Sequence, residues 1–254
     1  MHANFNLADR VALVTGGSSG VGLAIAQALA HAGADLILIG RRDDTLQAEA
    51  EQVHATTQRR VHTLVADLSD RPLLLETAER GLAAFGRVDI LVNAAGVNLR
   101  KPIEEVDFSA WDMHIDLHLT APFFLAKSLA PGMQQRGWGR IINLASLQSL
   151  RAFPNGAPYG AGKGGIVQLT RAMAETWGQD GITVNAIAPG FFPTALTAPV
   201  FENPELAAEN ARKTMIGRNG RMEDLAGPAV FLASPAAAYV TGQVLFVDGG
   251  YSAK

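Results

Sequence analysis

Short apolar runs rich in β-branched residues alternate along the chain with longer segments of helical periodicity. The spacing of apolar positions predicts helices over residues 20–31, 43–55, 72–85, 109–135, 157–178 and 223–233. The strand-like runs are VALVT (11–15), DLILIG (35–40), VHTLVAD (61–67), VDILVNAAG (88–96), RIINLAS (140–146), TVNAIAPG (183–190) and VLFVDGG (244–250). Several runs are apolar on both faces, as expected for strands that helices cover on each side. The alternation predicts a single doubly wound α/β domain over residues 1–254.

The segment 191–222 interrupts this alternation, because it is long, punctuated by proline and weakly periodic. Long irregular insertions in compact domains are often lids over a binding site. A surface loop with one short helix is the equally weighted alternative. We therefore treat 191–222 as a candidate substrate lid.

Composition excludes several classes of function. The formal net charge of the 254-residue chain is −3, which does not indicate a nucleic-acid-binding surface. The chain has no cysteine, so disulfides, thiolate metal sites and a thiol nucleophile are excluded. The first ten residues lack an apolar signal core, and no apolar run is long enough to cross a bilayer. We expect a cytoplasmic protein with a small-molecule substrate and with no nucleic-acid or membrane partner.

A glycine-rich turn, TGGSSGVG, follows the first predicted strand. Glycines let the backbone approach a pyrophosphate closely, and the N-terminus of the next helix supplies amide donors. A plain strand–helix turn is the alternative, but its place after the first strand of a βαβ unit favours nucleotide binding. The candidate cofactor-binding residues of this turn are Thr15, Gly16, Ser18, Ser19, Gly20, Val21 and Gly22.

The end of the second predicted strand favours NADP(H) over NAD(H). An NAD site usually has a carboxylate there, but this strand ends in Gly40 followed by Arg41 and Arg42. Asp35 begins the strand and so lies at the wrong end. Two guanidinium groups near the ribose would bind a 2′-phosphate. The alternative for the two arginines is a solvated helix start opposite neighbouring aspartates.

Three residues further along suggest acid–base chemistry. Ser146 ends a predicted strand, and Tyr159 and Lys163 lie four apart on one helix face. An ammonium beside a phenol stabilises the phenolate and lowers its pKa toward the range useful in catalysis. An isolated Tyr-x-x-x-Lys pair is commonly an ordinary surface pair. The preceding nucleotide-type turn gives this pair more weight.

Taken together, the ordered motifs TGGSSGVG, NAAG (93–96), Ser146, YGAGK (159–163) and APG (188–190) resemble the short-chain dehydrogenase/reductase family over essentially the whole chain. The resemblance implies a Rossmann-type parallel sheet of seven strands with helices on both faces. It also implies hydride transfer between a nicotinamide cofactor and a carbonyl or secondary alcohol.

Site roles follow from the same resemblance. Tyr159 would be the general acid/base, Ser146 would hold the substrate oxygen, and Lys163 would bond the nicotinamide ribose and tune the phenol. Tyr159 and Lys163 thus also belong to the implied cofactor site. Its further implied members are Asp67, Leu68, Asn93, Ala94, Gly96, Pro189, Gly190 and Thr194. For Asp67, a helix N-cap role is an equally plausible interpretation.

Several stretches are similar to the gluconate 5-dehydrogenases and deoxygluconate dehydrogenases within this family. They are NLRKPIEEVDFSAWD, LASLQSLRAFPNGAPYGAGKGG and GRMEDLAGPAVFLASPAAAYVTGQVLFVDGG. The similarity makes Arg100, Gln148 and Arg151 candidates for binding a polar or anionic substrate group, with ordinary surface positions as the alternative. Reductases of 3-oxoacyl-carrier-protein or of general ketones share most of the motifs and remain the alternative function.

The helix around WDMHIDLHLTAPFF (111–124) carries His114 and His118 four residues apart, a spacing found in zinc sites. At about 100° per residue, Asp112 and Asp116 point nearly the other way, so no metal site is expected. Similar sequences have asparagine, the fourth catalytic residue, where this chain has His118. That asparagine acts chiefly through its main-chain carbonyl, which holds a water of a proton relay.

Pro122 follows four residues after His118. Proline has no N–H, so the carbonyl of His118 loses its helical partner whatever the side chain. We expect catalysis to survive the replacement, and the imidazole is a further candidate for proton transfer. The rival from another class is a catalytically impaired nucleotide-binding or scaffold member. The resemblance also implies a homotetramer assembled through helices near 109–135 and 157–178 and through the C-terminal strand.

Overall fold

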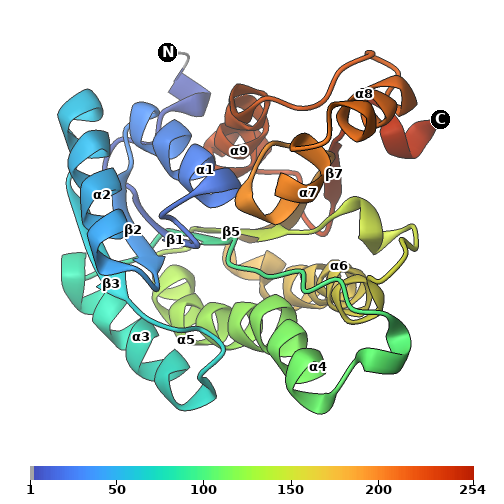
Figure 1. The fold of residues 1–254 in the computed structure, drawn as a ribbon. Helices are drawn as coiled ribbons and strands as arrows, with labels where there is room; N and C mark the ends of the chain where they lie inside the picture. Colours follow the sequence, from blue (N-terminus) through green and yellow to red (C-terminus); the bar gives the residue numbers. More distant parts are fainter. Residues whose placement is uncertain (1–2) are drawn as a thin grey trace.

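The structure, a computed structural model, describes residues 3–254 and contains a seven-stranded sheet (Figure 1). All strand pairs are parallel, and the strand order is β3-β2-β1-β4-β5-β6-β7. The strands are β1 (Val11–Thr15), β2 (Asp35–Gly40), β3 (Val61–Val65), β4 (Ile90–Asn93), β5 (Gly139–Leu144), β6 (Ile182–Pro189) and β7 (Val244–Val247). The predicted doubly wound parallel sheet is confirmed.

Helices cover both faces of the sheet. One layer contains α1 (Gly20–His31), α2 (Asp43–Thr57) and α9 (Ala226–Ala233), and the other contains α3 (Arg71–Phe85), α4 (Phe108–Ile115), α5 (Ala121–Gln135) and α6 (Ala157–Trp177). Alternate residues of β1 enter opposite layers, since Ala12 and Val14 pack under α1 whereas Val11 and Leu13 face α3 and α5. This two-sided burial explains why several strand sequences, such as VALVT of β1, are apolar on both faces.

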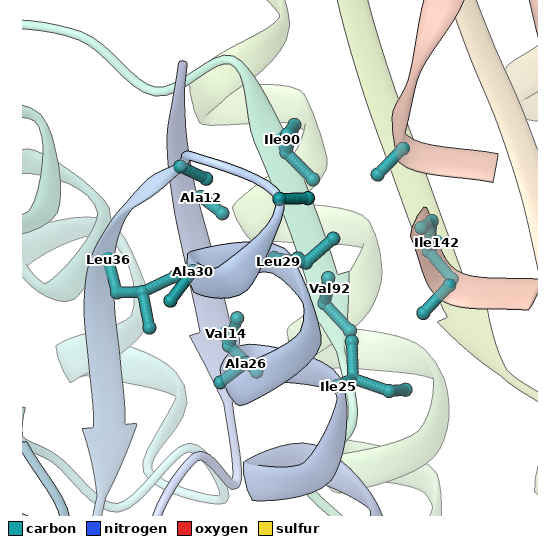
Figure 2. Close-up of a cluster of buried hydrophobic side chains, with 14 of the residues drawn as sticks. Ala12, Val14, Ile25, Ala26, Leu29, Ala30, Leu36, Ile90, Val92 and Ile142 are labelled. Carbon is teal, nitrogen blue, oxygen red and sulfur yellow. The ribbon is translucent and has the colours of Figure 1, made fainter. Parts of the chain in front are cut away.

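The core beneath α1 consists of tightly packed aliphatic side chains (Figure 2). Ile25, Ala26 and Leu29 of α1 are fully buried and lie over β1 and β4. Small alanines on the helix let its backbone approach the sheet closely. The packing holds the N-terminus of α1 firmly at the carboxyl end of β1, where the glycine turn lies.

The predicted helix over 109–135 is interrupted. It consists of α4, a π-helical turn (Asp116–Thr120) and α5, and the amide of Ala121 bonds the carbonyl of Asp116, five residues back. Pro122 lies at the start of α5 and cannot donate to either the α-type or the π-type acceptor. The missing donor gives a physical reason for the break.

The segment 191–222 contains more helix than a surface loop with one short helix would have. A single 3₁₀ turn (Ala195–Thr197) leads into α7 (Ala198–Phe201), and α8 (Pro204–Lys213) follows. Within residues 3–254, no helix is both long and apolar enough to span a bilayer.

Candidate active site

The carboxyl ends of β1, β4, β5 and β6 meet at one edge of the sheet. The strand order reverses between β1 and β4, because β1 continues to β2 on one side and β4 continues to β5 on the other. In open α/β sheets, ligands bind at such a switch point. The hydroxyl oxygen of Thr15 joins the two strands by accepting from the amides of Ala94 and Ala95, at 2.9 and 3.0 Å.

The glycine turn forms a cradle of backbone that side chains would fill. Gly16 has a φ of +65°, and a Cβ there would lie 3.0 Å from the nitrogen of Ala95. A Cβ on Gly22 would collide with the carbonyl oxygen of Gly16. Gly20 begins α1, and a Cβ on it would lie 3.2 Å from the Cγ2 atom of Thr194. The bare backbone at a helix N-terminus fits a pyrophosphate group.

The remaining residues predicted for the cofactor line the same edge. Ser19 is the N-cap of α1, and Val21 lies in its first turn. Ser18 is buried beside the end of β2, where a Cβ on Gly40 would lie 3.1 Å from its Oγ atom. The amide of Asn93 donates to Asn143 at 2.8 Å, and its buried Oδ1 atom has no partner within the described residues.

Arg41 and Arg42 directly follow β2 and are exposed to solvent. The guanidinium of Arg41 lies 3.9 Å from the carboxylate of Asp67, which follows the neighbouring strand β3. Asp35 sits at the opposite end of β2 and is paired with Arg59 and Arg60. A carboxylate at the start of the strand therefore cannot select the cofactor at its end.

Asp67 does not cap the helix that follows it, because the N-cap of α3 is Asp70. Its Oδ1 atom instead accepts from the amide and the hydroxyl of Ser69, at 2.9 and 2.7 Å. Partial burial opposes ionisation, but these bonds and Arg41 together hold the pKa of Asp67 below its usual value. Leu68 beside it is buried.

Ser146 emerges from the end of β5 and caps the short helical turn Leu147–Ser149. Its Oγ atom accepts from the amide of Gln148 at 3.1 Å, and its hydroxyl group also forms a hydrogen bond with Tyr159. Ser149 connects this turn to helix α6, because its hydroxyl donates to the carbonyl of Lys163 at 2.6 Å. This bond fixes the position of the turn relative to helix α6.

Tyr159 and Lys163 lie one turn apart in α6, and both are buried. Burial raises the pKa of Tyr159, against a hydrogen bond with Ser146 and the positive charge of Arg100. Burial also lowers the pKa of Lys163 to about 7. The Lys163 ammonium donates to the carbonyl of Leu144 and lies 5.6 Å from the Tyr159 ring centroid. Direct stabilisation of the phenolate by the lysine, which the sequence predicts, is not what this arrangement shows.

The two histidines of the interrupted helix differ in their partners. His114 bonds through both ring nitrogens, to the carbonyl of Ala110 at 2.6 Å and to the amide of Leu99 at 3.3 Å. His118 bonds only through Nε2, to the carbonyl of Val97 at 2.9 Å. Across the described residues, no group of three or more acidic or histidine side chains is arranged to hold a metal ion.

Pro122 leaves two main-chain carbonyls of the π-helical turn without a helical donor. The carbonyl of His118 loses its α-type partner and that of Leu117 its π-type partner, since both would be the missing N–H of Pro122. The His118 carbonyl therefore lacks the α-type donor, as the proline predicts. Its role toward a water stays a prediction.

The three candidate substrate residues do not occupy equivalent places. Arg100 lines a crevice together with Tyr159 and exerts a charge on its phenol. Gln148 packs beside the N-terminus of α6, where its side-chain oxygen touches the space a Cβ on Gly156 would need. Arg151 points away toward the C-terminus, donating to the carbonyls of Ser252 and Lys254 at 3.4 and 3.3 Å.

The crevice beside Tyr159 is also lined by residues that the sequence did not indicate as binding residues. The polar ones are Asn98, Lys101, His114 and Asn155. Asn98 has a buried Oδ1 atom without a partner in the described part of the chain. Asn155 adopts a φ of +58° in the turn before α6. The Pro-Asn-Gly sequence at 154–156 is the signal that could have identified this turn.

A family model described as enoyl-(acyl carrier protein) reductase matches residues 16–252. Gluconate 5-dehydrogenase of Gluconobacter oxydans is 39% identical over 251 residues, covering 97% of this chain and 96% of that protein. The 2-dehydro-3-deoxy-D-gluconate 5-dehydrogenase of Pseudoalteromonas atlantica is 39% identical over 254 residues, and the match covers 100% of both chains. A crystal structure of gluconate 5-dehydrogenase from Burkholderia cenocepacia with NADP and tartrate superimposes with a TM-score of 0.94. It is 35% identical and covers 99% of this chain and 98% of its own.

Proposed function

This chain belongs to the short-chain dehydrogenase/reductase family, and from that premise we propose that its substrate is a sugar acid or a related polyol. It is an NAD(P)-dependent oxidoreductase that moves a hydride between a nicotinamide and a carbonyl or secondary alcohol. The rival interpretation as a binding-only scaffold rested on the missing asparagine. The presence of Ser146 after β5 and of Tyr159 and Lys163 one turn apart in α6 supports the proposal of an active enzyme.

In the proposed mechanism, Tyr159 donates its phenolic proton to the carbonyl oxygen during reduction and takes it back during oxidation. Ser146 donates a hydrogen bond to the same oxygen and keeps its proton, while its Oγ atom accepts from the amide of Gln148. The ammonium of Lys163 lies over the Tyr159 ring, 5.6 Å from its centroid, and supplies a positive charge there. When bound, the nicotinamide would supply or accept the hydride. The raised pKa of Tyr159 keeps the phenol protonated before substrate and cofactor arrive.

The observation that carries the substrate assignment is the position of Arg100 beside Tyr159 in one crevice. A guanidinium there suits a carboxylate whose carbon chain presents a hydroxyl to the phenol. Relatives of this chain that match over its full length are named for sugar acids, and one was crystallised with tartrate, a polyhydroxy acid. Gln148, Lys101 and Asn155 are proposed to contact the hydroxyl groups.

A substrate panel with the purified enzyme tests this proposal. The panel contains aldonates, 2-dehydro-3-deoxyaldonates, polyols and a 3-oxoacyl thioester, each with NADP(H) and NAD(H). We expect turnover of at least one sugar acid, read as a change in reduced-nicotinamide absorbance. Turnover of the thioester alone would favour the acyl-carrier-protein reductase alternative, and no turnover of any sugar acid or polyol would contradict the substrate proposal.

We propose NADP(H) as the preferred cofactor. Arg41 and Arg42 follow β2 at the place of the ribose 2′ position, and Ser18 lies beside them. The Burkholderia relative was crystallised with NADP. A clearly higher kcat/KM with NAD than with NADP would contradict this preference.

Two further proposals concern assembly and closure. Phe108 and Trp111 of α4 expose 87% and 42% of their surface, which supports a homotetramer formed through this helix, α6 and the C-terminal strand. Light scattering gives the oligomeric state directly.

Segment 191–222 is proposed as the lid, tethered where the backbone amide of Met215 donates to the carbonyl of Gly249. Slower amide exchange in 191–222 when cofactor and substrate are both present is the expected result. The cytoplasmic location stays a prediction.

A further inference from the structure

His118 is held between two segments that carry different parts of the site. Its Nε2 atom bonds the carbonyl of Val97, which belongs to the loop after β4. Its ring meets the ring of Tyr159 at right angles, with the centroids 5.1 Å apart. The side chain is only 2% exposed. A single imidazole thus touches both the loop that follows the 93–96 segment and the helix that carries the phenol.

Two glycines make room for this imidazole. A Cβ on Gly96 would lie 2.6 Å from the Cε1 atom of His118 and 3.3 Å from its Nδ1 atom. A Cβ on Gly162 of α6 would lie 2.9 Å from the Cβ atom of His118. Contacts this close do not exist between real side chains, so neither glycine tolerates a larger residue while the imidazole stays in place.

The hydrogen bonds define the protonation of the ring. A carbonyl only accepts, so Nε2 carries the proton and Nδ1 has a free lone pair. The ring is surrounded by His114, Lys163 and Tyr159. Burial and the charge of Lys163 hold the pKa of His118 well below its usual value. The imidazole therefore stays neutral across the ordinary working range of pH.

We propose that His118 is a positioning residue, a neutral wedge between Gly96 and Tyr159 that sets the distance between the loop after β4 and helix α6. Hydride transfer requires the reacting groups to be held in a near-attack geometry, and small displacements cost large factors in rate. The wedge acts through Tyr159 rather than by transferring a proton. The inference rests on the proposed role of Tyr159 and goes beyond it by assigning a function to the imidazole and to Gly96.

A double-mutant cycle tests the wedge with four proteins: wild type, Gly96→Ala, His118→Asn and the double variant. Asparagine lacks the Cε1 and Nε2 atoms, so it removes the closest contact with an alanine at 96. Each single variant is expected to lower kcat by roughly ten-fold or more, whereas the second substitution, made in the Gly96→Ala background, restores kcat several-fold. The melting temperature should follow the same pattern: His118→Asn should lower it in the wild-type background and raise it in the Gly96→Ala background.

Matched controls use neighbours of similar character. His114→Asn in the Gly96→Ala background removes a histidine that is equally buried but does not touch Gly96, and it should restore nothing. Gly164→Ala tests alanine in α6 at a position where nothing described lies within 4 Å of an added Cβ. Simple additivity of Gly96→Ala and His118→Asn in both kcat and melting temperature would overturn the wedge.

The pH profile separates positioning from proton transfer. His118→Asn should lower kcat while leaving its pH midpoints where they are in the wild type, because burial holds the pKa of His118 well below its usual value and the ring is already neutral at neutral and alkaline pH. If the pH profile of kcat in this variant lost one of its limbs or shifted a midpoint, the proposal would be overturned in favour of an imidazole that transfers a proton. The thermal cycle needs no turnover, so it stays informative if the proposed substrate class is wrong.

Discussion

The ammonium of Lys163 lies 5.6 Å from the ring centroid of Tyr159 and donates its hydrogen bond to the main-chain carbonyl of Leu144, the last residue of β5. This bond ties the catalytic helix α6 to the sheet edge from which Ser146 emerges. The lysine is buried, and the carbonyl of Leu144 accepts a hydrogen bond from its ammonium. The ammonium thus lies over the Tyr159 ring and is hydrogen-bonded to the sheet rather than to the phenol.

Replacing Tyr159 with phenylalanine should abolish most turnover without loss of cofactor binding. The variant keeps the ring that packs against His118 but lacks the proton, so kcat should fall by about 10²–10⁴-fold. Steady-state kinetics and a fluorescence titration with reduced cofactor measure the two properties. Tyr239→Phe, at a fully exposed tyrosine, is the control and should behave like the wild type. A Tyr159→Phe variant with full activity would exclude this residue as the acid.

Replacing Lys163 with methionine should stabilise the cofactor-free protein in a pH-dependent manner. Burial lowers the pKa of the Lys163 ammonium from its usual 10.5 to about 7, so the unfolded state binds more protons between these pH values. The wild type therefore gains stability as pH rises from 7 to about 10. The methionine variant lacks this gain.

The difference in melting temperature between Lys163→Met and wild type should thus be largest at or below pH 7 and shrink toward pH 10. Relief of one buried charge by a packed methionine, about 1–2 kcal/mol, corresponds to a rise of roughly 2–8 °C. Calorimetry at several pH values measures it. A difference that is constant with pH would mean that the lysine pKa is not lowered in the folded protein.

Removing both arginines after β2 should weaken NADP selectively. The double variant Arg41→Ala and Arg42→Ala is expected to lose roughly 10–100-fold in kcat/KM with NADP, as for a lost charge-assisted hydrogen bond. The values with NAD should change little. Arg171→Ala removes an exposed arginine on α6 as the control. Equal losses with both cofactors would show that the arginines do not read the 2′-phosphate.

Arg100 and Arg151 should separate in their effects on the substrate. Arg100→Ala should raise KM for a sugar acid by roughly 10-fold or more and change KM for an uncharged polyol much less. Arg151→Ala should shift KM only slightly, because its guanidinium bonds the carbonyls of Ser252 and Lys254. The same steady-state assays with both substrates give the comparison. A larger effect from Arg151 would reverse the assignment.

The sequence by itself determined the sheet and indicated the candidate catalytic residues, because both depend on local pattern. Two-sided apolar runs predict buried parallel strands, and a glycine turn after the first strand predicts the cradle at Gly16 and Gly20. The missing N–H of Pro122 is likewise a property of one residue. It sufficed to predict that the carbonyl of His118 loses its α-type donor, although not the π-helical turn around it.

Only the tertiary structure decided the relationships between distant residues. The guanidinium of Arg151 donates to the carbonyls of Ser252 and Lys254, which lie 101 and 103 residues further along the chain. A local sequence pattern does not indicate which distant groups will lie next to a given side chain. The ammonium of Lys163 bonds Leu144 across 19 residues instead of the neighbouring phenol. The fit of His118 against Gly96 arises where a loop and a helix meet. Close packing depends on the shapes of both partners. The proposed role of the imidazole could therefore be inferred only from the positions of His118 and Gly96 in the folded structure.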